Sequence, residues 1–280
     1  MLARNKMADV AAAPLRSHLP AIADQSDPRG LLKFTTTIHV RYLPLVPIEL
    51  PISPFDMSFQ IFNSGFQKIT GTTPKLEICL NHTAYPWAHE AGVYIPKEDQ
   101  MFVTSNRIHG ADGTQKIQIS KISLRNDGTC LREEIAPDIP MANGGVNYKD
   151  GVLFCSQGTQ DQPSSLIFME KTTPYKCTVI LDSFYGRQFN SINDVVVHGD
   201  GSIWFTDPIY GYEQNFRPLP QLPNQVYRYD PELQSVRTVA DGFGRPNGIC
   251  FSPDERVVYI TDTDSIHGDG TVNLNRPSTM

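Results

Sequence analysis

The sequence predicts an all-β protein of the β-propeller class. Its 280 residues include 22 prolines, 20 glycines and 10% aromatic residues, and such a mixture of turn formers and strand formers is typical of β-rich proteins. From about residue 56, short β-type runs alternate with Gly, Asp, Asn and Pro. The chain also contains a hairpin repeat of about 50 residues, a period that indicates propeller blades.

The repeat is carried by four segments that begin at intervals of 50 to 54 residues, at Glu90, Asn143, Asn193 and Asn247. In each segment a strand is followed by a turn (PKED, KDG, GDG or SPDE) and by a second strand that ends near Thr or Ser. The first strand of each segment is therefore expected to be the innermost strand of a blade.

The third repeat predicts a complete blade. Its strands are expected at 194–198, 202–206, 224–229 and 235–239, with a long loop over 207–223. The turn residues between them, Gly-Asp-Gly and Asp-Pro-Glu, favour antiparallel pairing of successive strands.

Two regions are predicted along the chain. Residues 1–55 are expected to form a flexible or irregular N-terminal extension, because residues 1–30 are polar and aperiodic and four prolines interrupt 31–55. Residues 56–280 are expected to form a partial propeller of three full blades and part of a fourth, which is a C-terminally truncated form. The exposed blade edges of such a form could support self-association.

Composition and charge exclude several classes of function. The net charge of −6 argues against a nucleic-acid partner that needs a basic face. No apolar run approaches the roughly 20 residues that span a bilayer, and the N-terminus lacks the apolar region of a secretory signal. A cytoplasmic location is therefore expected, with an organelle-targeting leader as the alternative, since Arg4, Lys6 and Arg16 occur with little acid.

The repeat also predicts a shared site. The first residue of each innermost strand lies at one mouth of the propeller channel, so Glu90, Asn143, Asn193 and Asn247 should converge there. A carboxylate and amide oxygens are hard ligands suited to Ca²⁺ or Mg²⁺. The alternative is local: each Asn could form an Asx turn at a strand edge.

Loops at the same mouth are expected to form the wall of a substrate pocket. They carry Asp207, Tyr210 and Tyr212 in one loop and His267 in another, although such loops can also be a solvated rim. His89 and His267 could relay a proton or serve as ordinary hydrogen-bonding residues. The chain has no GxSxG, P-loop or GxGxxG motif, so serine-hydrolase and nucleotide-binding readings have no support.

Two phrases, NDVVVHGDGSIWFTDP and RPNGICFSPDERVVYITD, resemble the senescence-marker-protein / gluconolactonase / luciferin-regenerating-enzyme family, and especially its fungal lactonohydrolase-like members. The segment AHEAGVYIP matches less specifically. The resemblance covers about residues 56–280 and is strong from 140 to 270. It implies a six-bladed propeller with a catalytic divalent cation at the channel mouth, usually Ca²⁺, with Mg²⁺, Mn²⁺ or Zn²⁺ as alternatives.

The resemblance further implies a lactonase, a hydrolase that opens a lactone or related cyclic ester to a hydroxy acid by metal-polarised attack of water. It implies metal ligation by Glu90, Asn193 and Asn247, with Asn143 contributing to the pocket. The family's fourth ligand and proposed general base, an aspartate, would fall beyond residue 280, so no catalytic residue is assigned. Weak calcium binding and little turnover are expected of this form.

Two alternatives remain open at this point. One is a non-catalytic propeller fragment that binds a small molecule or a protein partner. The other is hydrolysis of an organophosphate or other ester at the same metal site, which the pocket loops would decide.

Overall fold

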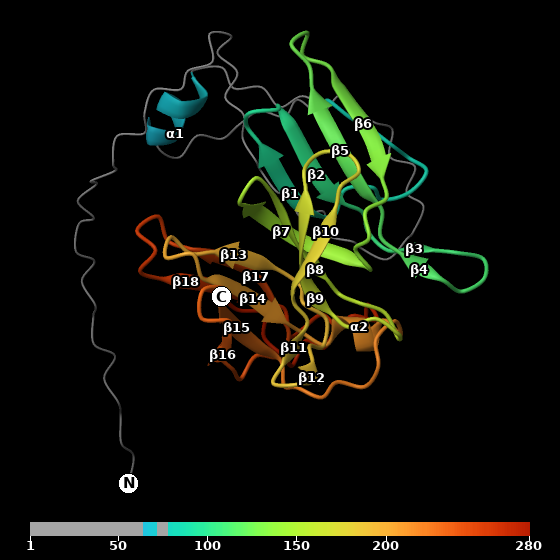
Figure 1. The fold of residues 1–280 in the computed structure, drawn as a ribbon, viewed down its shortest axis with the longest axis vertical. Coiled ribbons are helices and arrows are strands. Elements are labelled where there is room, and N and C mark those ends of the chain that lie inside the picture. Colours follow the sequence, from blue (N-terminus) through green and yellow to red (C-terminus); the bar gives the residue numbers. More distant parts are fainter. Residues whose placement is uncertain (1–63, 72–77) are drawn as a thin grey trace. The chain divides into compact units, whose positions relative to one another are not determined.

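A computed structural model describes residues 64–71 and 78–280, so the extension predicted over 1–55 lies outside the described residues. The chain divides into two compact units. In the first, the described part is α1 (Ser64–Thr70) and Gly71. In the second, residues 78–280 form antiparallel sheets (Figure 1). Among the described residues, neither helix has the length and apolar character needed to cross a membrane.

Three four-stranded sheets and one two-stranded sheet follow one another along the chain. The first contains β1 (Glu90–Ile95), β2 (Gln100–Thr104), β5 (Ile119–Leu124) and β6 (Cys130–Ile135). The second contains β7 (Ala142–Tyr148), β8 (Gly151–Ser156), β9 (Ser165–Glu170) and β10 (Cys177–Leu181). The third contains β13 (Val195–Val197), β14 (Ile203–Asp207), β15 (Gln225–Asp230) and β16 (Ser235–Ala240), and the fourth contains β17 (Pro246–Phe251) and β18 (Val258–Asp262).

Each sheet is a meander, in which strands adjacent in the sequence pair antiparallel. The four strands of the third sheet agree with the predicted ones to within two residues at each end. The predicted long loop differs from the structure in one respect, because it contains a short helix, α2 (Tyr210–Glu213). Two small hairpins, β3 (Ile108–His109) with β4 (Gln115–Lys116) and β11 (Ser183–Phe184) with β12 (Arg187–Gln188), lie in connections.

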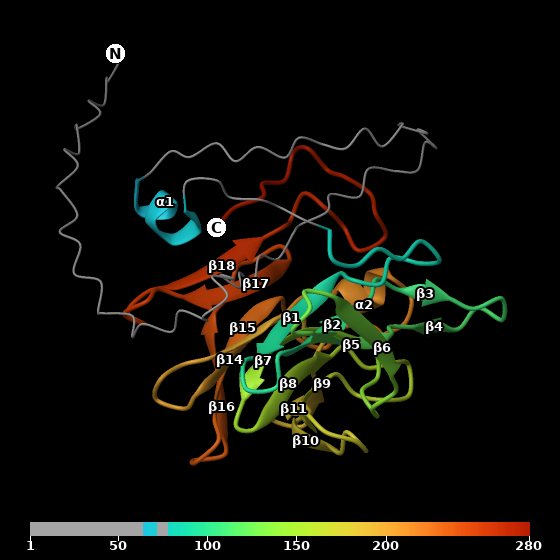
Figure 2. The same cartoon turned by 90° about the horizontal axis from the view of Figure 1, so that it is seen from above.

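The first strands of successive sheets lie beside one another. Strand β7 contacts both β1 and β13, and β17 contacts β13 and β14. Figure 2 shows the sheets arranged around these first strands. All-β architecture of the propeller type is thus confirmed for residues 78–280, and the start of each innermost strand faces the same region.

The hydrophobic core lies between neighbouring sheets, and β8 belongs to two parts of it. All six residues of β8 are buried. Because side chains alternate between the faces of a strand, Val152 and Phe154 enter the cluster shared with the first sheet, while Leu153 and Cys155 enter the cluster shared with the third. A strand buried on both faces reads as a continuous apolar run, as GVLFC does.

Aromatic side chains fill the second of these clusters. Tyr227 is fully buried and its ring stacks on Phe205 at 5.4 Å between centroids. The ring of Phe189 meets both of them edge to face, at 5.2 Å from each. Such a group buries a large apolar area with specific ring geometry.

We expect Phe205→Ala to lower the free energy of unfolding by about 3–5 kcal/mol, because it removes a fully buried ring and leaves a cavity. Chemical denaturation followed by circular dichroism measures this loss. Leu233→Ala, at a side chain that is 71% exposed, is the control and should change stability by less than about 0.5 kcal/mol. Equal effects of the two variants would show that the sheets do not share this core.

Candidate functional site

A cavity of about 260 Å³ lies where the innermost strands begin. Its walls carry polar groups from all four sheets and from α2. The lining residues are His89, Glu90, Asn106, Arg107, Ile117, Asn143, Gln157, Asn193, Tyr210, Gln214, Asn247, Thr263, Ile266, His267, Gly268 and Gly270. The four residues that begin the sequence repeats therefore meet in one cavity.

Threonine hydroxyls hold the main chain of the neighbouring innermost strand. Thr104, the last residue of β2, donates to the carbonyl oxygen of Asn143 at 3.1 Å. Thr206, at the equivalent place in β14, donates to the carbonyl oxygen of Asn247 at 2.7 Å. The Thr near the end of the second strand of a repeat thus holds the next innermost strand in place. The sequence pattern shows the position of this Thr and not its role.

Backbone contact between the second and third sheets requires a glycine. The amide of Gly144 donates to the carbonyl oxygen of Asn193 at 2.9 Å. A Cβ at position 144 would stand 2.5 Å from that oxygen, a distance that a side chain cannot adopt. Gly144, the second residue of the NGG motif, is therefore needed for the close approach of the two backbone segments.

These bonds use the backbone of the Asn residues and leave their side-chain oxygens free. Asn143 and Asn193 are only 6% and 5% exposed, yet among the described residues neither amide side chain has a hydrogen-bond partner. The carboxylate of Glu90 likewise accepts no hydrogen bond among the described residues, and the imidazole nitrogen Nε2 of His89 lies 4.0 Å from it. These side chains line the cavity, so a ligand that supplies positive charge or hydrogen-bond donors can reach their oxygens.

Burial disfavours the ionised form of two carboxyl groups at the site, those of Glu90 and Asp194. Burial raises the pKa of Glu90 to about 7, and the nearby Asp194 adds to the rise. Burial also raises the pKa of Asp194 to about 6, although the amides of Ile249 and Val195 oppose the shift by donating to its oxygens. Positive charge in the cavity would stabilise both carboxylates.

The donor set fits a hard divalent cation rather than zinc. One carboxylate and three amide oxygens are the groups that Ca²⁺ and Mg²⁺ accept. Within residues 64–71 and 78–280 the structure contains no cluster of three or more His, Cys, Asp and Glu side chains, the arrangement typical of zinc.

The structure separates the residues predicted for substrate binding into two groups. Asn143, Tyr210 and His267 line the cavity, whereas Asp207 and Tyr212 do not. Tyr212 is 44% exposed on α2. Asp207 is fully buried, and its two oxygens accept the amide hydrogens of Asn190 and Ser191.

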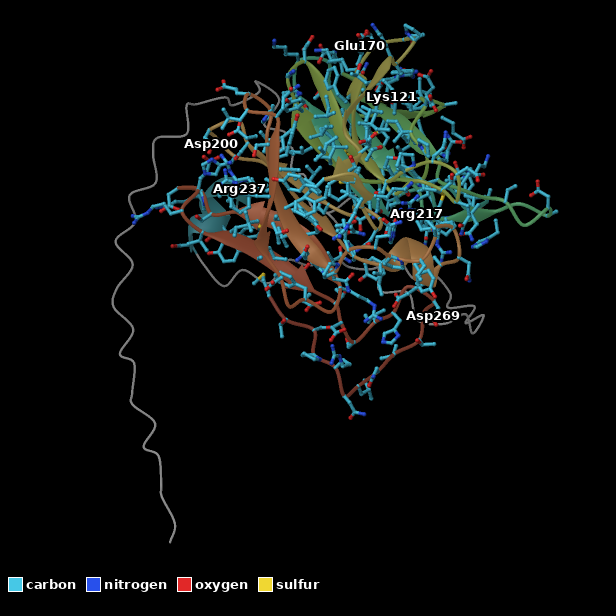
Figure 3. The ribbon with its side chains drawn as sticks, turned by 60° about the horizontal axis from the view of Figure 1, so that its bottom comes forward. Lys121, Glu170, Asp200, Arg217, Arg237 and Asp269 are labelled. Atoms are coloured by element: carbon cyan, nitrogen blue, oxygen red, sulfur yellow. The ribbon has the colours of Figure 1, made fainter. Side chains whose placement is uncertain are left out.

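Asp207 therefore contacts the backbone that leads to Asn193. Arg217 holds the same segment from the other side, donating to the carbonyl oxygens of Phe189 and Asn190. Figure 3 shows Arg217 and Asp269 near α2, while Asp200 lies on the opposite side of the sheets, in the turn between β13 and β14.

A buried network of charges holds the cavity wall together. Arg245 donates to both oxygens of Glu213 on α2 and to Asp264 at 2.9 Å. Arg276 also donates to Asp264, at 2.6 Å, and Glu213 accepts the amide hydrogen of Gly268. The network joins α2, β17 and the loop after β18, each of which contributes a lining residue.

The sequence reading missed Arg245, Glu213 and Asp264, because residues paired from distant loops leave no periodic signal. It also missed Arg107 and Gln157, which line the cavity from connections of the first and second sheets. The repeated Thr at the ends of β2 and β14 is the one signal that could have been read further.

Comparison with known proteins gives a consistent result. A family model described as the SMP-30/Gluconolactonase/LRE-like region matches residues 91–267. Lactonohydrolase oryL of Aspergillus oryzae is 30% identical over 214 residues, which cover 73% of this chain and 47% of that protein. The gluconolactonase of Zymomonas mobilis is 34% identical over 129 residues, covering 45% of this chain and 34% of its own length.

Among solved structures, the X-ray structure of a protein assigned as a gluconolactonase superposes with a TM-score of 0.51 at 25% identity. The match covers 65% of this chain and 58% of that one. The chain spans about half, or less, of the length of these curated relatives.

We expect the stabilising effect of Asp207 to fall as the pH rises. Burial raises the pKa of its carboxyl to about 7, opposed by the amides of Asn190 and Ser191 and by Arg217. A pKa raised by folding favours the folded state most at pH values below the ordinary pKa of about 4, and the contribution is lost as the pH rises through 7. Asp207→Asn removes this titration and one acceptor.

Urea unfolding at pH 5 and pH 8 measures the effect. The variant should be the less stable protein at pH 5, and the difference from wild type should shrink by about 1.4 kcal/mol per pH unit up to pH 7. Asp161→Asn, at an exposed site, is the control. A difference that stays constant or grows with pH would contradict the assignment.

Proposed function

The chain belongs to the SMP-30/gluconolactonase/LRE-like family, and we propose that its cavity binds a divalent cation and a lactone and opens the lactone ring to a hydroxy acid. The observation that carries the proposal is that Glu90, Asn143, Asn193 and Asn247 line one cavity, where no hydrogen bond among the described residues engages their side-chain oxygens. Relatives named lactonohydrolase and gluconolactonase support a cyclic ester as substrate.

Glu90, Asn193 and Asn247 would hold the cation, most simply Ca²⁺, with Mg²⁺ or Mn²⁺ as the alternatives that accept the same oxygen ligands. A divalent cation bound there supplies a Lewis acid for the ester carbonyl. Two neutral amides and one carboxylate leave the site with little negative charge of its own. The residues thus orient a cation and exclude water through burial without neutralising it.

The remaining lining groups would place the substrate and move protons. Asn143 and His267 offer an amide and an imidazole to the hydroxyl groups of a sugar-like lactone. In hydrolysis the oxygen of water bonds to the carbonyl carbon, the ring C–O bond breaks, and the leaving oxygen takes up a proton. His89 and His267 are the lining imidazoles that could accept the proton of water.

One observation favours a second function. Among the described lining residues Glu90 is the single carboxylate, and a group committed to a cation is a poor general base. A cavity with a cation and no dedicated base suits reversible binding of a small hydroxylated molecule. This is the non-catalytic alternative, and it uses the same residues.

We expect Ca²⁺ to raise the melting temperature of the purified chain, because a ligand that binds only the folded state stabilises it by about 2.7 kcal/mol at 100 times its Kd. Addition of EDTA should reverse the rise. Glu90→Gln should remove most of the response by deleting the charged ligand, whereas Glu232→Gln, at an exposed turn, should retain it.

The same proteins are then assayed with a panel of lactones, with hydroxy-acid release followed by titration. Hydrolysis that requires Glu90 and is lost on chelation supports the lactonase. A calcium response without hydrolysis supports the non-catalytic alternative. No calcium response in wild type, or an equal response in Glu90→Gln, would refute the cation site.

A further inference from the structure

A chain of hydrogen bonds leads from Asn247 away from the cavity. The side-chain nitrogen Nδ2 of Asn247 lies 3.5 Å from the hydroxyl oxygen of Tyr210. That hydroxyl is in close contact with Oγ1 of Thr263, and Thr263 Oγ1 lies 3.5 Å from the carbonyl oxygen of Arg245. The three links join β17, α2 and the loop after β18.

The last group of the chain sets the direction of all the others. The Thr263 hydroxyl has one proton, and its donation to the carbonyl oxygen of Arg245, which also accepts the amide hydrogen of Thr263 at 3.1 Å, defines one arrangement of the hydrogen-bond chain. Thr263 can then only accept from Tyr210, and Tyr210, having given its proton, can only accept from Asn247. In this arrangement the amide nitrogen of Asn247 faces Tyr210, as it does in the structure, and Oδ1 lies on the other side of the amide.

The start and the end of this chain are both fixed. The backbone of Asn247 is held by Thr206. The amide of Arg245 donates to Asp262 at 2.7 Å, and its guanidinium is paired with Glu213 and Asp264. Since Glu213 is the last residue of α2, the same ion pairs keep Tyr210, its first residue, in place.

We propose that Tyr210 is a positioning residue, whose hydroxyl selects the orientation of the Asn247 amide that presents Oδ1 to the cavity. This differs from a direct substrate contact, because the hydroxyl is already engaged on both sides. An Asn side chain offers one oxygen and one NH₂ of nearly equal size. Without Tyr210, the amide of the metal-free protein could adopt either orientation, and cation binding would have to select the one that presents the oxygen.

The inference rests on the proposed cation site, and its consequence is a change in cation affinity. Loss of a partner that orients a ligand typically lowers metal affinity 10–100-fold. We expect Tyr210→Phe, which keeps the ring and removes the hydroxyl, to weaken Ca²⁺ binding about 10-fold. Tyr259→Phe, at a tyrosine that is 42% exposed, should bind Ca²⁺ as wild type does.

Titration calorimetry with Ca²⁺ is combined with a rescue. In an Asn247→Asp background either oxygen can face the cavity, so adding Tyr210→Phe should cause less than a twofold further loss. A purely structural role of Tyr210 predicts the same loss in both backgrounds. Equal losses, or wild-type affinity in Tyr210→Phe alone, would overturn the inference.

A measurement on the metal-free protein separates this inference from the proposed function. In chains labelled with ¹⁵N-asparagine, the side-chain NH₂ signals of Asn247 are identified by their absence in Asn247→Asp. Their exchange with water should be severalfold faster in Tyr210→Phe than in wild type or Tyr259→Phe. Unchanged exchange would overturn the positioning role, whereas absence of Ca²⁺ binding in wild type would overturn the proposed function and leave the exchange result to decide the positioning role.

Discussion

The site depends on three asparagines whose main chain and side chain have different roles. The backbone carbonyl oxygens of Asn143, Asn193 and Asn247 accept hydrogen bonds from the adjoining sheet. These bonds fix the main chain where three innermost strands come together, so the asparagine side chains are not needed to hold the strands to one another. The main chain thus sets the position of each asparagine, and the side-chain oxygens remain available to a ligand.

This arrangement has a cost that the rest of the fold must offset. Burial raises the pKa values of the carboxyl groups of Glu90, Asp194 and Asp207. The stabilising contribution comes from elsewhere, chiefly from the two hydrophobic clusters on either side of β8. A strained polar centre supported by apolar layers is what a pre-organised binding site requires.

Local sequence patterns predicted the structural features that repeat along the chain. They did not predict the features that occur only once. The strands of the third sheet and the convergence of the four repeat-initial residues follow from a period near 50 residues, and the structure agrees with both. The helix α2 escaped prediction because its four residues, YGYE, have no helical periodicity. Asp207 was predicted as a pocket residue from its place in a loop, but two nearby backbone amides capture its carboxylate.

The ion pairs of Arg245 have a consequence for how such a pocket can change over evolutionary time. Asn143, Asn193 and Asn247 form the floor of the cavity. They are held there by hydrogen bonds to their main-chain carbonyl oxygens, which most side-chain substitutions leave intact. The wall is held by side chains: Glu213 and Asp264 pair with the guanidinium of Arg245, and Arg276 pairs with Asp264. Replacement of these loop residues can reshape the wall while the oxygen-bearing floor persists, so one floor can be inherited by proteins that recognise different small molecules.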